Sequence, residues 1–400
     1  MSENIIGSSG SKAPASSVGR YLKNNLRESG MLLSLVAIMI FFQIVTGGVL
    51  MKPLNLTNLV LQNSYIVIMA LGMLLIIVTG HIDLSVGSVC GFIGALAAVM
   101  MVKLGVPFPI AAILCLLVGG LIGAIQGFWV AYFNIPSFIV TLAGMLVFKG
   151  LMLAVLGGQS VGPFPVVFQK LSSGFIPEII GTSGGVYLTS LVIGVLLAGF
   201  MIWQNVKSRQ RHIAHEVETE PFGLFVIKNI LFFAAIAYLS LLISMHRGLP
   251  NVLIIMAVLI AAYAFLTNRT VLGRQIYAVG GNRHAAKLSG VKTEWLTFLA
   301  FVNMGVLAAL AGLVFAARLN TATPKAGIGF ELDVIAACFI GGASAYGGVG
   351  RVTGAVIGAL IMGVMNNGMS ILGIGIDYQQ VIKGIVLLGA VCIDVYNQKR

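Results

Sequence analysis

The chain is a succession of long apolar runs separated by short polar stretches. A helix needs about 20 apolar residues to cross the hydrocarbon core of a bilayer. Twelve segments approach this length, and together they predict an all-α bundle of about 10–12 membrane-spanning helices, allowing for segments that are short. The predicted spans are 31–50, 58–79, 84–102, 108–131, 137–156, 185–203, 223–243, 250–267, 296–316, 333–347 (the shortest), 352–372 and 379–396.

Two polar stretches organise the chain. Residues 1–30 are polar and rich in serine, without a cleavage site after the first apolar run, and predict a disordered cytoplasmic tail rather than a signal peptide. Residues 31–400 then form a single transmembrane domain. The most polar interior stretch, 204–222, predicts a solvated loop between two halves, about 31–203 and 223–400.

Composition agrees with a membrane protein. Hydrophobic residues make up 58% of the 400 residues and charged residues only 9%, and the mean hydropathy is +1.01. No soluble core could bury so many apolar side chains, so lipid must cover many of them. The 50 glycines indicate helices that pack closely in the membrane.

The net charge of +12 has a topological explanation. With the N-terminus in the cytoplasm, sixteen Lys and Arg residues fall on the inner side and six on the outer side. Short cytoplasmic loops carry such an excess. The pattern therefore predicts that both termini are cytoplasmic, and because no basic domain exists, it predicts no nucleic-acid partner.

The sequence gives little support for a metal site or for an enzymatic activity. The four cysteines, Cys90, Cys115, Cys338 and Cys392, lie in apolar segments at unrelated spacings and predict buried small side chains. His212 and His215 could bind a metal on a helix, but no further ligand is near in sequence, so we expect no metal. No Walker A or HExxH sequence occurs, which argues against an enzyme.

The segment GHIDLSVGS, residues 80–88, places an acid between two apolar runs. Asp83 and Ser85 could cap a helix, and Gly80 and Gly87 permit a tight turn and close packing. One interpretation is a capped turn at the membrane surface. The other is a helix break within the membrane, near a transport path. We expect Asp83 to hold a glycine-rich junction or gate where the protein moves.

Other polar residues within spans leave two interpretations open. Lys149 and Lys383 are charges in apolar surroundings, which either act in transport or extend to an interface. Uncharged polar side chains would suit a path for a neutral polyol, or would join helices to each other. The candidate substrate path comprises Asn63, Asn303, Asn366 and Asn367, and Gln126 is of the same kind.

The loop 268–295 is basic, and its centre, NRHAAKLSGV, predicts a short helix that Gly290 ends. Ala285, Ala286 and Leu288 would give it a small apolar surface. Such a helix could dock into a groove of a soluble partner or could have no partner.

Several motifs resemble one family in order and spacing, from about residue 55 to the C-terminus. They are GHIDLSVGS, IPSFIVTLAGM (135–145), LGRQIYAVGGNRHAAKLSGV (272–291) and FELDVIAACFIGGASAYGGVG (330–350). The chain resembles bacterial ABC importer permeases of the ribose/xylose class, which transport monosaccharides with a binding protein. Within that family it is most similar to permeases for D-xylose and for multiple monosaccharides.

The resemblance implies a type II ABC importer permease in the bacterial inner membrane. Its expected partners are a second permease copy, an ATPase subunit, a periplasmic sugar-binding protein and a monosaccharide. ATP and Mg would be bound by the ATPase, and this chain would hold no cofactor. The implied ATPase-coupling helix consists of Arg283, His284, Ala285, Ala286, Lys287, Leu288, Ser289 and Gly290.

Some interpretations rest on placement alone. Glu178, Glu331, Asp333 and Asp377 would face outward, toward the binding protein. Residues 86–96 resemble 349–360, which would fit either an internal repeat or chance. Rival functions are an ABC permease for a nucleoside or branched-chain amino acid, an ion-coupled sugar transporter, which the scarcity of intramembrane acids disfavours, and a membrane scaffold.

Overall fold

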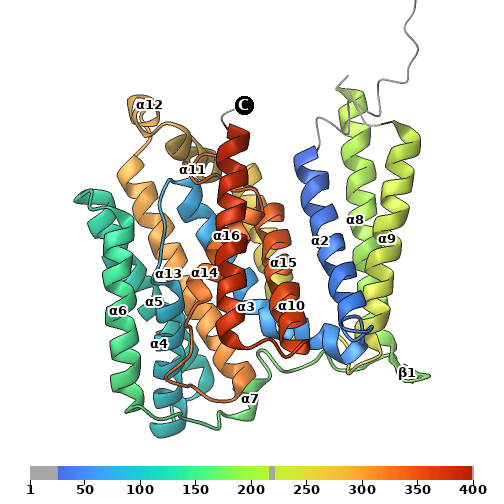
Figure 1. Ribbon diagram of the computed structural model, residues 1–400, viewed down its shortest axis with the longest axis horizontal. Helices are drawn as coiled ribbons and strands as arrows, with labels where there is room; N and C mark the ends of the chain where they lie inside the picture. The colour runs from blue at the N-terminus through green and yellow to red at the C-terminus, as the bar shows by residue number, and fades with distance from the viewer. Residues whose placement is uncertain (1–25, 216–220, 399–400) are drawn as a thin grey trace, which may run out of the picture.

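A computed structural model describes residues 26–215 and 221–398. Over these residues the chain is a bundle of helices with one two-stranded hairpin (Figure 1). Nine of the described helical segments are long and apolar enough to cross a membrane. They are α3 (Pro53–Val78), α4 (Val86–Ala98) continued by the π-helical η1 (Val99–Lys103), α5 (Phe108–Tyr132), α6 (Ser137–Leu156), α8 (Leu188–Ala214), α9 (Phe222–Ser244), α10 (Asn251–Arg269), α13 (Thr293–Leu319) and α15 (Val352–Ile371).

The other described elements are not among these nine segments. They are α2 (Leu26–Val45), α7 (Val166–Gln169), β1 (Thr182–Ser183), β2 (Val186–Tyr187), α11 (Val271–Gly281), α12 (Arg283–Leu288), α14 (Phe330–Ile340) and α16 (Ile376–Gln398). Helices α11 and α12 lie at one end, which we call the α12 end, and α7 and the strands lie at the opposite end, the hairpin end (Figure 1).

Helix α3 is the centre of the core. Its residues 63–78 are all buried, as expected for a helix that is apolar on every side, and it packs against α13, α14 and α15. Helices α5 and α13 pack closely, with Gly119 and Gly123 of α5 facing the backbone of α13. This confirms that glycines serve close helix packing.

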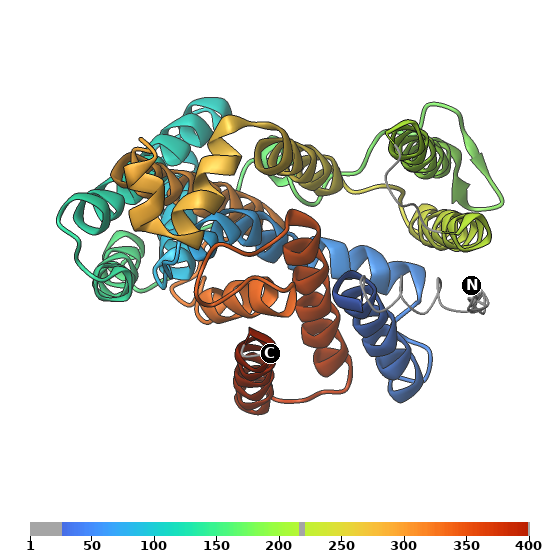
Figure 2. The same ribbon diagram turned by 90° about the horizontal axis from the view of Figure 1, so that it is seen from above.

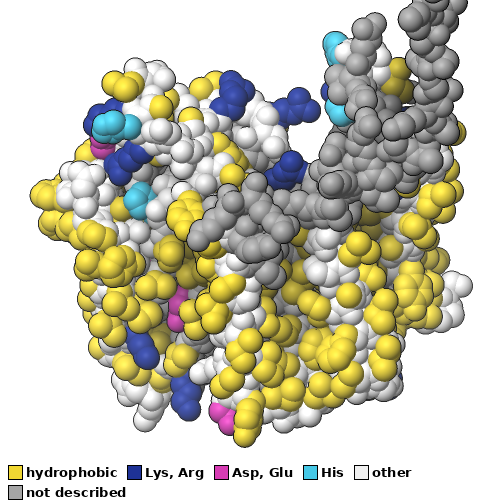
Figure 3. Space-filling view, turned by 45° about the horizontal axis from the view of Figure 1, so that its top comes forward, with side chains coloured by type: hydrophobic (Ala, Val, Ile, Leu, Met, Phe, Trp, Pro, Cys, Tyr) yellow, Lys and Arg dark blue, Asp and Glu magenta, His cyan; other side chains and the backbone are white. Residues whose placement is uncertain are grey.

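Helices α8 and α9 pack mainly on each other and stand at the edge of the bundle (Figure 2). Apolar side chains cover much of the flank, whereas most of the Lys, Arg and His side chains in view gather toward the α12 end (Figure 3). This distribution fits a chain whose flank faces lipid.

The structure agrees with most predicted spans and corrects three boundaries. The span 137–156 coincides with α6. Helix α2 begins at Leu26, inside the predicted tail, whose residues 1–25 lie outside the described residues. The predicted loop 204–222 is wrong up to Ala214, because α8 continues through it. The predicted span 333–347 is also wrong: α14 ends at Ile340, and residues 341–351 are not helical.

Candidate functional site

The first feature of the site is the break between α3 and α4. Helix α3 ends at Val78, Gly80 adopts a φ of +81° that favours glycine, and α4 begins at Val86. Asp83 is only 3% exposed. Its Oδ1 accepts hydrogen bonds from the Ser85 backbone N–H at 2.8 Å and the Ser85 hydroxyl at 2.7 Å.

Neighbouring helices enclose this break. The Ser85 hydroxyl accepts a hydrogen bond from Gln126 Nε2 of α5 at 3.0 Å, and the Ile82 backbone N–H donates to the Ser137 hydroxyl of α6 at 3.2 Å. Of the two interpretations left open by the sequence, a junction buried in the bundle therefore fits better than a turn at its surface.

Burial also shifts the pKa values of two side chains in the break, Asp83 and His81. It raises the pKa of Asp83 to about 6, against the opposing effect of the two Ser85 hydrogen bonds. The pKa of His81 falls to about 4, because burial and then the nearby Arg283 disfavour its charged form.

The second feature is the half-length helix α14. After α13 the chain turns back without helix, and Ala322 pairs with Val161 through two backbone hydrogen bonds of 2.9 and 3.0 Å. Phe330, the first residue of α14, stacks on Tyr65 with 3.9 Å between ring centroids. Tyr65 lies midway along α3, so α14 begins in the middle of the bundle.

The starts of α4 and α14 touch. A Cβ atom on Gly87 would come within 2.3 Å of the Gly327 carbonyl oxygen and 2.4 Å of Glu331 Oε2. Only glycine fits at this position without a shift of backbone. Two interrupted helices that meet in the bundle interior are typical of substrate sites in transporters.

An ion pair ties α14 to α16. Asp333 is 2% exposed, and Lys383 Nζ lies 2.9 Å from its Oδ1 and 3.0 Å from its Oδ2. Asn366 Nδ2 of α15 also donates to Oδ2, at 3.1 Å. The prediction that Asp333 faces outward toward a binding protein was therefore wrong. The predicted span 333–347 begins at Asp333 and so puts this residue at the outer membrane surface, whereas α14 begins at Phe330 inside the bundle.

The other three acidic residues that we predicted to face outward have different surroundings. Glu178 accepts hydrogen bonds from the Thr189 backbone N–H at 2.9 Å and hydroxyl at 2.6 Å, which anchor the segment before the hairpin. Glu331 is partly buried beside Gly87, whereas Asp377 is exposed at the start of α16.

The candidate substrate-path residues each connect two elements. Asn63 donates to the Gly363 carbonyl, Asn303 accepts from the Tyr263 hydroxyl, and Asn367 exchanges hydrogen bonds with Asn55. Asn366 binds Asp333. These contacts favour the helix-joining interpretation. Only Asn366 lies against the ion pair, so the structure does not bring the four together, and the substrate path stays a prediction.

The predicted short helix in the basic loop is confirmed as α12. Asn282 caps its start, since its Oδ1 accepts from the Ala285 backbone N–H at 2.9 Å, and Gly290 follows its end with a φ of +83°. Ala286 is 6% exposed and faces the protein, whereas Leu288 is 87% exposed. Leu288 is therefore the large apolar side chain of α12 that a partner could contact, beside the exposed Ala285.

Gly280, just before α12, contacts the end of α3 and the loop after α14. A Cβ atom on Gly280 would lie 1.7 Å from the Val78 carbonyl oxygen and 2.6 Å from the Gly348 nitrogen. The Gly348 backbone N–H in turn donates to that carbonyl at 2.8 Å. Hence the end of α11, the end of α3 and the loop after α14 meet at one point, which we call the glycine junction.

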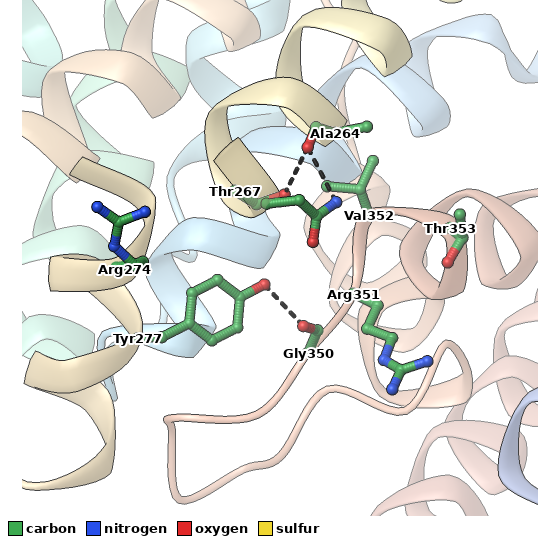
Figure 4. A pocket seen from close by; sticks show the side chains of 9 residues that line it. Ala264, Thr267, Arg274, Tyr277, Gly350, Arg351, Val352 and Thr353 are labelled. Atoms are coloured by element: carbon green, nitrogen blue, oxygen red, sulfur yellow. Dashed lines mark hydrogen bonds between the residues drawn. The ribbon is translucent and has the colours of Figure 1, made fainter. Parts of the chain in front are cut away.

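A cavity of about 600 Å³ opens beside the glycine junction (Figure 4). The Tyr277 hydroxyl donates to the Gly350 carbonyl at 2.7 Å, and both residues line the cavity. Arg274 and Arg351 border it from α11 and from the start of α15. Burial raises the pKa of Tyr277, so its hydroxyl keeps its proton for this bond. Sequence reasoning missed Tyr277, Gly280 and Gly348 as contacts, although the resemblance had included their motifs.

Comparisons of the sequence with known proteins assign the chain to a family. Residues 55–391 match the family described as branched-chain amino acid transport system / permease component, and the chain belongs to this family of multi-pass membrane permeases. It is 40% identical to the xylose transport system permease protein XylH of Haemophilus influenzae over 94% of this chain and 98% of that protein.

Two further relatives extend the comparison. The chain is 38% identical to XylH of Escherichia coli K12, over 94% of this chain and 93% of the relative. It is 34% identical to the ribose import permease protein RbsC of the same strain, over 86% of each chain. No solved structure matches the chain.

Proposed function

We propose that the chain is the membrane-spanning subunit of an ATP-driven importer that carries a monosaccharide delivered by a periplasmic binding protein. The observation that carries this proposal is the glycine junction. It joins α12, a short exposed helix at one end of the bundle, to interrupted helices inside it. A soluble motor that moves α12 would therefore act directly on the interior.

In this mechanism an ATPase subunit binds Leu288 and its surroundings, and ATP and Mg bind only to that subunit. Closure of the ATPase shifts α12, and the tight contacts of Gly280 transmit the shift to α3 and to the loop after α14. A partner can bias only a conformational equilibrium to which it is coupled. Helix α14, interrupted at both ends, is the element we expect to move.

The proposed cargo is a neutral sugar, with a pentose such as D-xylose as the first candidate. Two relatives carry xylose in their names and one carries ribose. Asp333 and Lys383 neutralise each other inside the bundle, which suits an uncharged polyol. The second candidate is a branched-chain amino acid, because the family description names that cargo.

Localisation and assembly belong to the same proposal. We place the α12 end in the cytoplasm and the chain in a bacterial inner membrane, since the α12 end holds many of the basic residues. A second copy of the chain would complete the path along α14 and α16 as a homodimer. The ion pair lies just beneath the surface of α16, with Lys383 20% exposed.

The experiment compares Leu288→Arg with Ile179→Arg, a matched control at the hairpin end with an exposure of 81%. The chain is co-expressed with its neighbouring ATPase and binding protein, and uptake of labelled D-xylose, D-ribose and L-leucine is measured. Wild type and Ile179→Arg should retain the ATPase and take up sugar, whereas Leu288→Arg should lose both. Equal ATPase retention by the two variants would exclude α12 as the contact, and uptake of leucine alone would select the second candidate.

A further inference from the structure

The ends of α8 and α10 enclose a basic cavity at the α12 end that the transport mechanism does not use. Its volume is about 440 Å³. It is lined by Gln204, Asn205, Lys207, Ser208, Arg211, His212, His215 and Arg269. Three permanent cations and two histidines therefore border it, and no acid is among the lining residues that the structure describes.

These cations are available to a ligand. Lys207, Arg211 and Arg269 are exposed, and none of them forms a salt bridge within the described part of the chain. The lining residue Asn205 is held by α9, because its Nδ2 donates to Asn229 Oδ1 at 3.0 Å. Several positive charges around one cavity call for an anion with several oxygens, such as a phosphate group.

Apolar side chains on the same helices continue below these charges. Phe200, Trp203, Lys207 and Arg211 follow one face of α8 at helical spacing, and the Lys207 ammonium lies 4.8 Å from the centroid of the Trp203 ring. Phe265 lies one turn before Arg269 on α10 and is exposed. Tryptophan beside lysine marks the level of lipid headgroups, with acyl chains beyond.

We propose that this cavity binds the phosphate headgroup of an anionic phospholipid, with its acyl chains along the exposed apolar side chains of α8 and α10. A ligand with a charged head and apolar tails matches both parts of the surface, whereas free phosphate matches only the first. Basic pockets between membrane helices recognise headgroups in this way. The bound lipid would hold the helix pair α8 and α9 against α10.

The test uses the purified full-length chain in detergent and native mass spectrometry with phosphatidylglycerol and phosphatidylcholine. The variant Lys207→Gln/Arg211→Gln/Arg269→Gln removes the cavity charges. The control variant Lys52→Gln/Lys170→Gln/Lys325→Gln removes three exposed cations elsewhere. Wild type and control should prefer phosphatidylglycerol, and the cavity variant should bind it roughly 100-fold more weakly.

Two results would overturn the proposal. One is equal binding of phosphatidylglycerol by the cavity and control variants, as would follow if Glu216, Glu218 and Glu220, next in the sequence, neutralised the cavity. The other is displacement of the lipid by excess inorganic phosphate, which would make the site one for free phosphate. If the triple variant fails to fold, Arg211→Gln alone and the salt dependence of wild-type binding give the same decision. No ATPase or uptake is involved, so this result is independent of the transport proposal.

Discussion

At the scale of residues, Asp83 is an acid whose charged form is costly in the folded protein. Its pKa of about 6, above the usual 3.8, means that the folded state holds the proton more tightly than the unfolded state. Stability therefore decreases as the pH rises from about 4 to about 6 and is constant above. Asn cannot ionise, yet its side-chain oxygen can still accept from the Ser85 N–H.

We predict that Asp83→Asn gains stability relative to wild type over that pH window, by about 3 kcal/mol at neutral pH. Thermal unfolding of both proteins in detergent from pH 4 to pH 8 measures this difference. A difference that does not change with pH would contradict a buried acid with a raised pKa. In the same variant we expect impaired sugar uptake at a normal membrane level, because the junction charge is lost.

The ion pair of Asp333 and Lys383 gives a second prediction at this scale. Lys383→Met leaves a buried carboxylate without its counter-charge and should lower the free energy of unfolding by about 3 kcal/mol. Adding Asp333→Asn should restore most of that loss, since no charge then remains. Unfolding midpoints of the two single variants and the double variant decide the matter. Additive losses would show that the pair is not coupled.

At the scale of elements, α11 and α12 act as one lever only if Gly280 keeps its close contacts. Gly280→Ala places a methyl group 1.7 Å from the Val78 oxygen, so backbone must shift. The adjacent Gly281 has nothing within 4 Å of its Cβ position and supplies a matched control. Gly280→Ala should retain ATPase binding but lose at least tenfold in uptake, a loss of about 1.4 kcal/mol or more in coupling.

The readout for this pair is uptake normalised to membrane level, together with ATPase co-purification. Gly281→Ala should behave as wild type in both. If Gly280→Ala transports normally, the glycine junction does not transmit motion, and α12 must act through α13 instead.

The elements also show what the sequence can and cannot predict. Apolar runs located nearly every long helix, because lipid imposes both their length and their composition. The segment 204–214 is polar but contains no Gly or Pro, and Lys, Arg and Gln favour helix, so polarity alone wrongly predicted a loop. The apolar run 333–347 contains glycines, and Gly342 and Gly347 have positive φ, which ends the helix early.

The same limit applies to the site. The sequence identified α12 and Asp83, since capping residues and a lone acid are local signals. It could not identify the contact of Gly280 with Val78 or the bond of Tyr277 to Gly350, because these join segments far apart in sequence through backbone atoms. Lys383 was noticed as a charge, but its partner Asp333 was not.

At the scale of the whole molecule, two glycine-rich helix starts hold the half-length helix from its two ends. Gly87 of α4 contacts the region before α14, and Gly354 of α15 contacts Gly341 just after it. These are the segments 86–96 and 349–360 whose sequences resemble each other. The two similar segments thus contact opposite ends of α14.

The orientation of the molecule decides whether this arrangement can serve an ATPase. We predict that Leu288 faces the cytoplasm and Ile179 the opposite side. Single cysteines at each position, in a Cys392→Ser background, are treated with a membrane-impermeant maleimide on intact spheroplasts. Cys90, Cys115 and Cys338 are buried and should not react. Ile179→Cys should be labelled at once, and Leu288→Cys only after lysis. Labelling of Leu288→Cys in intact spheroplasts would place α12 outside, where no ATP-driven partner could reach it.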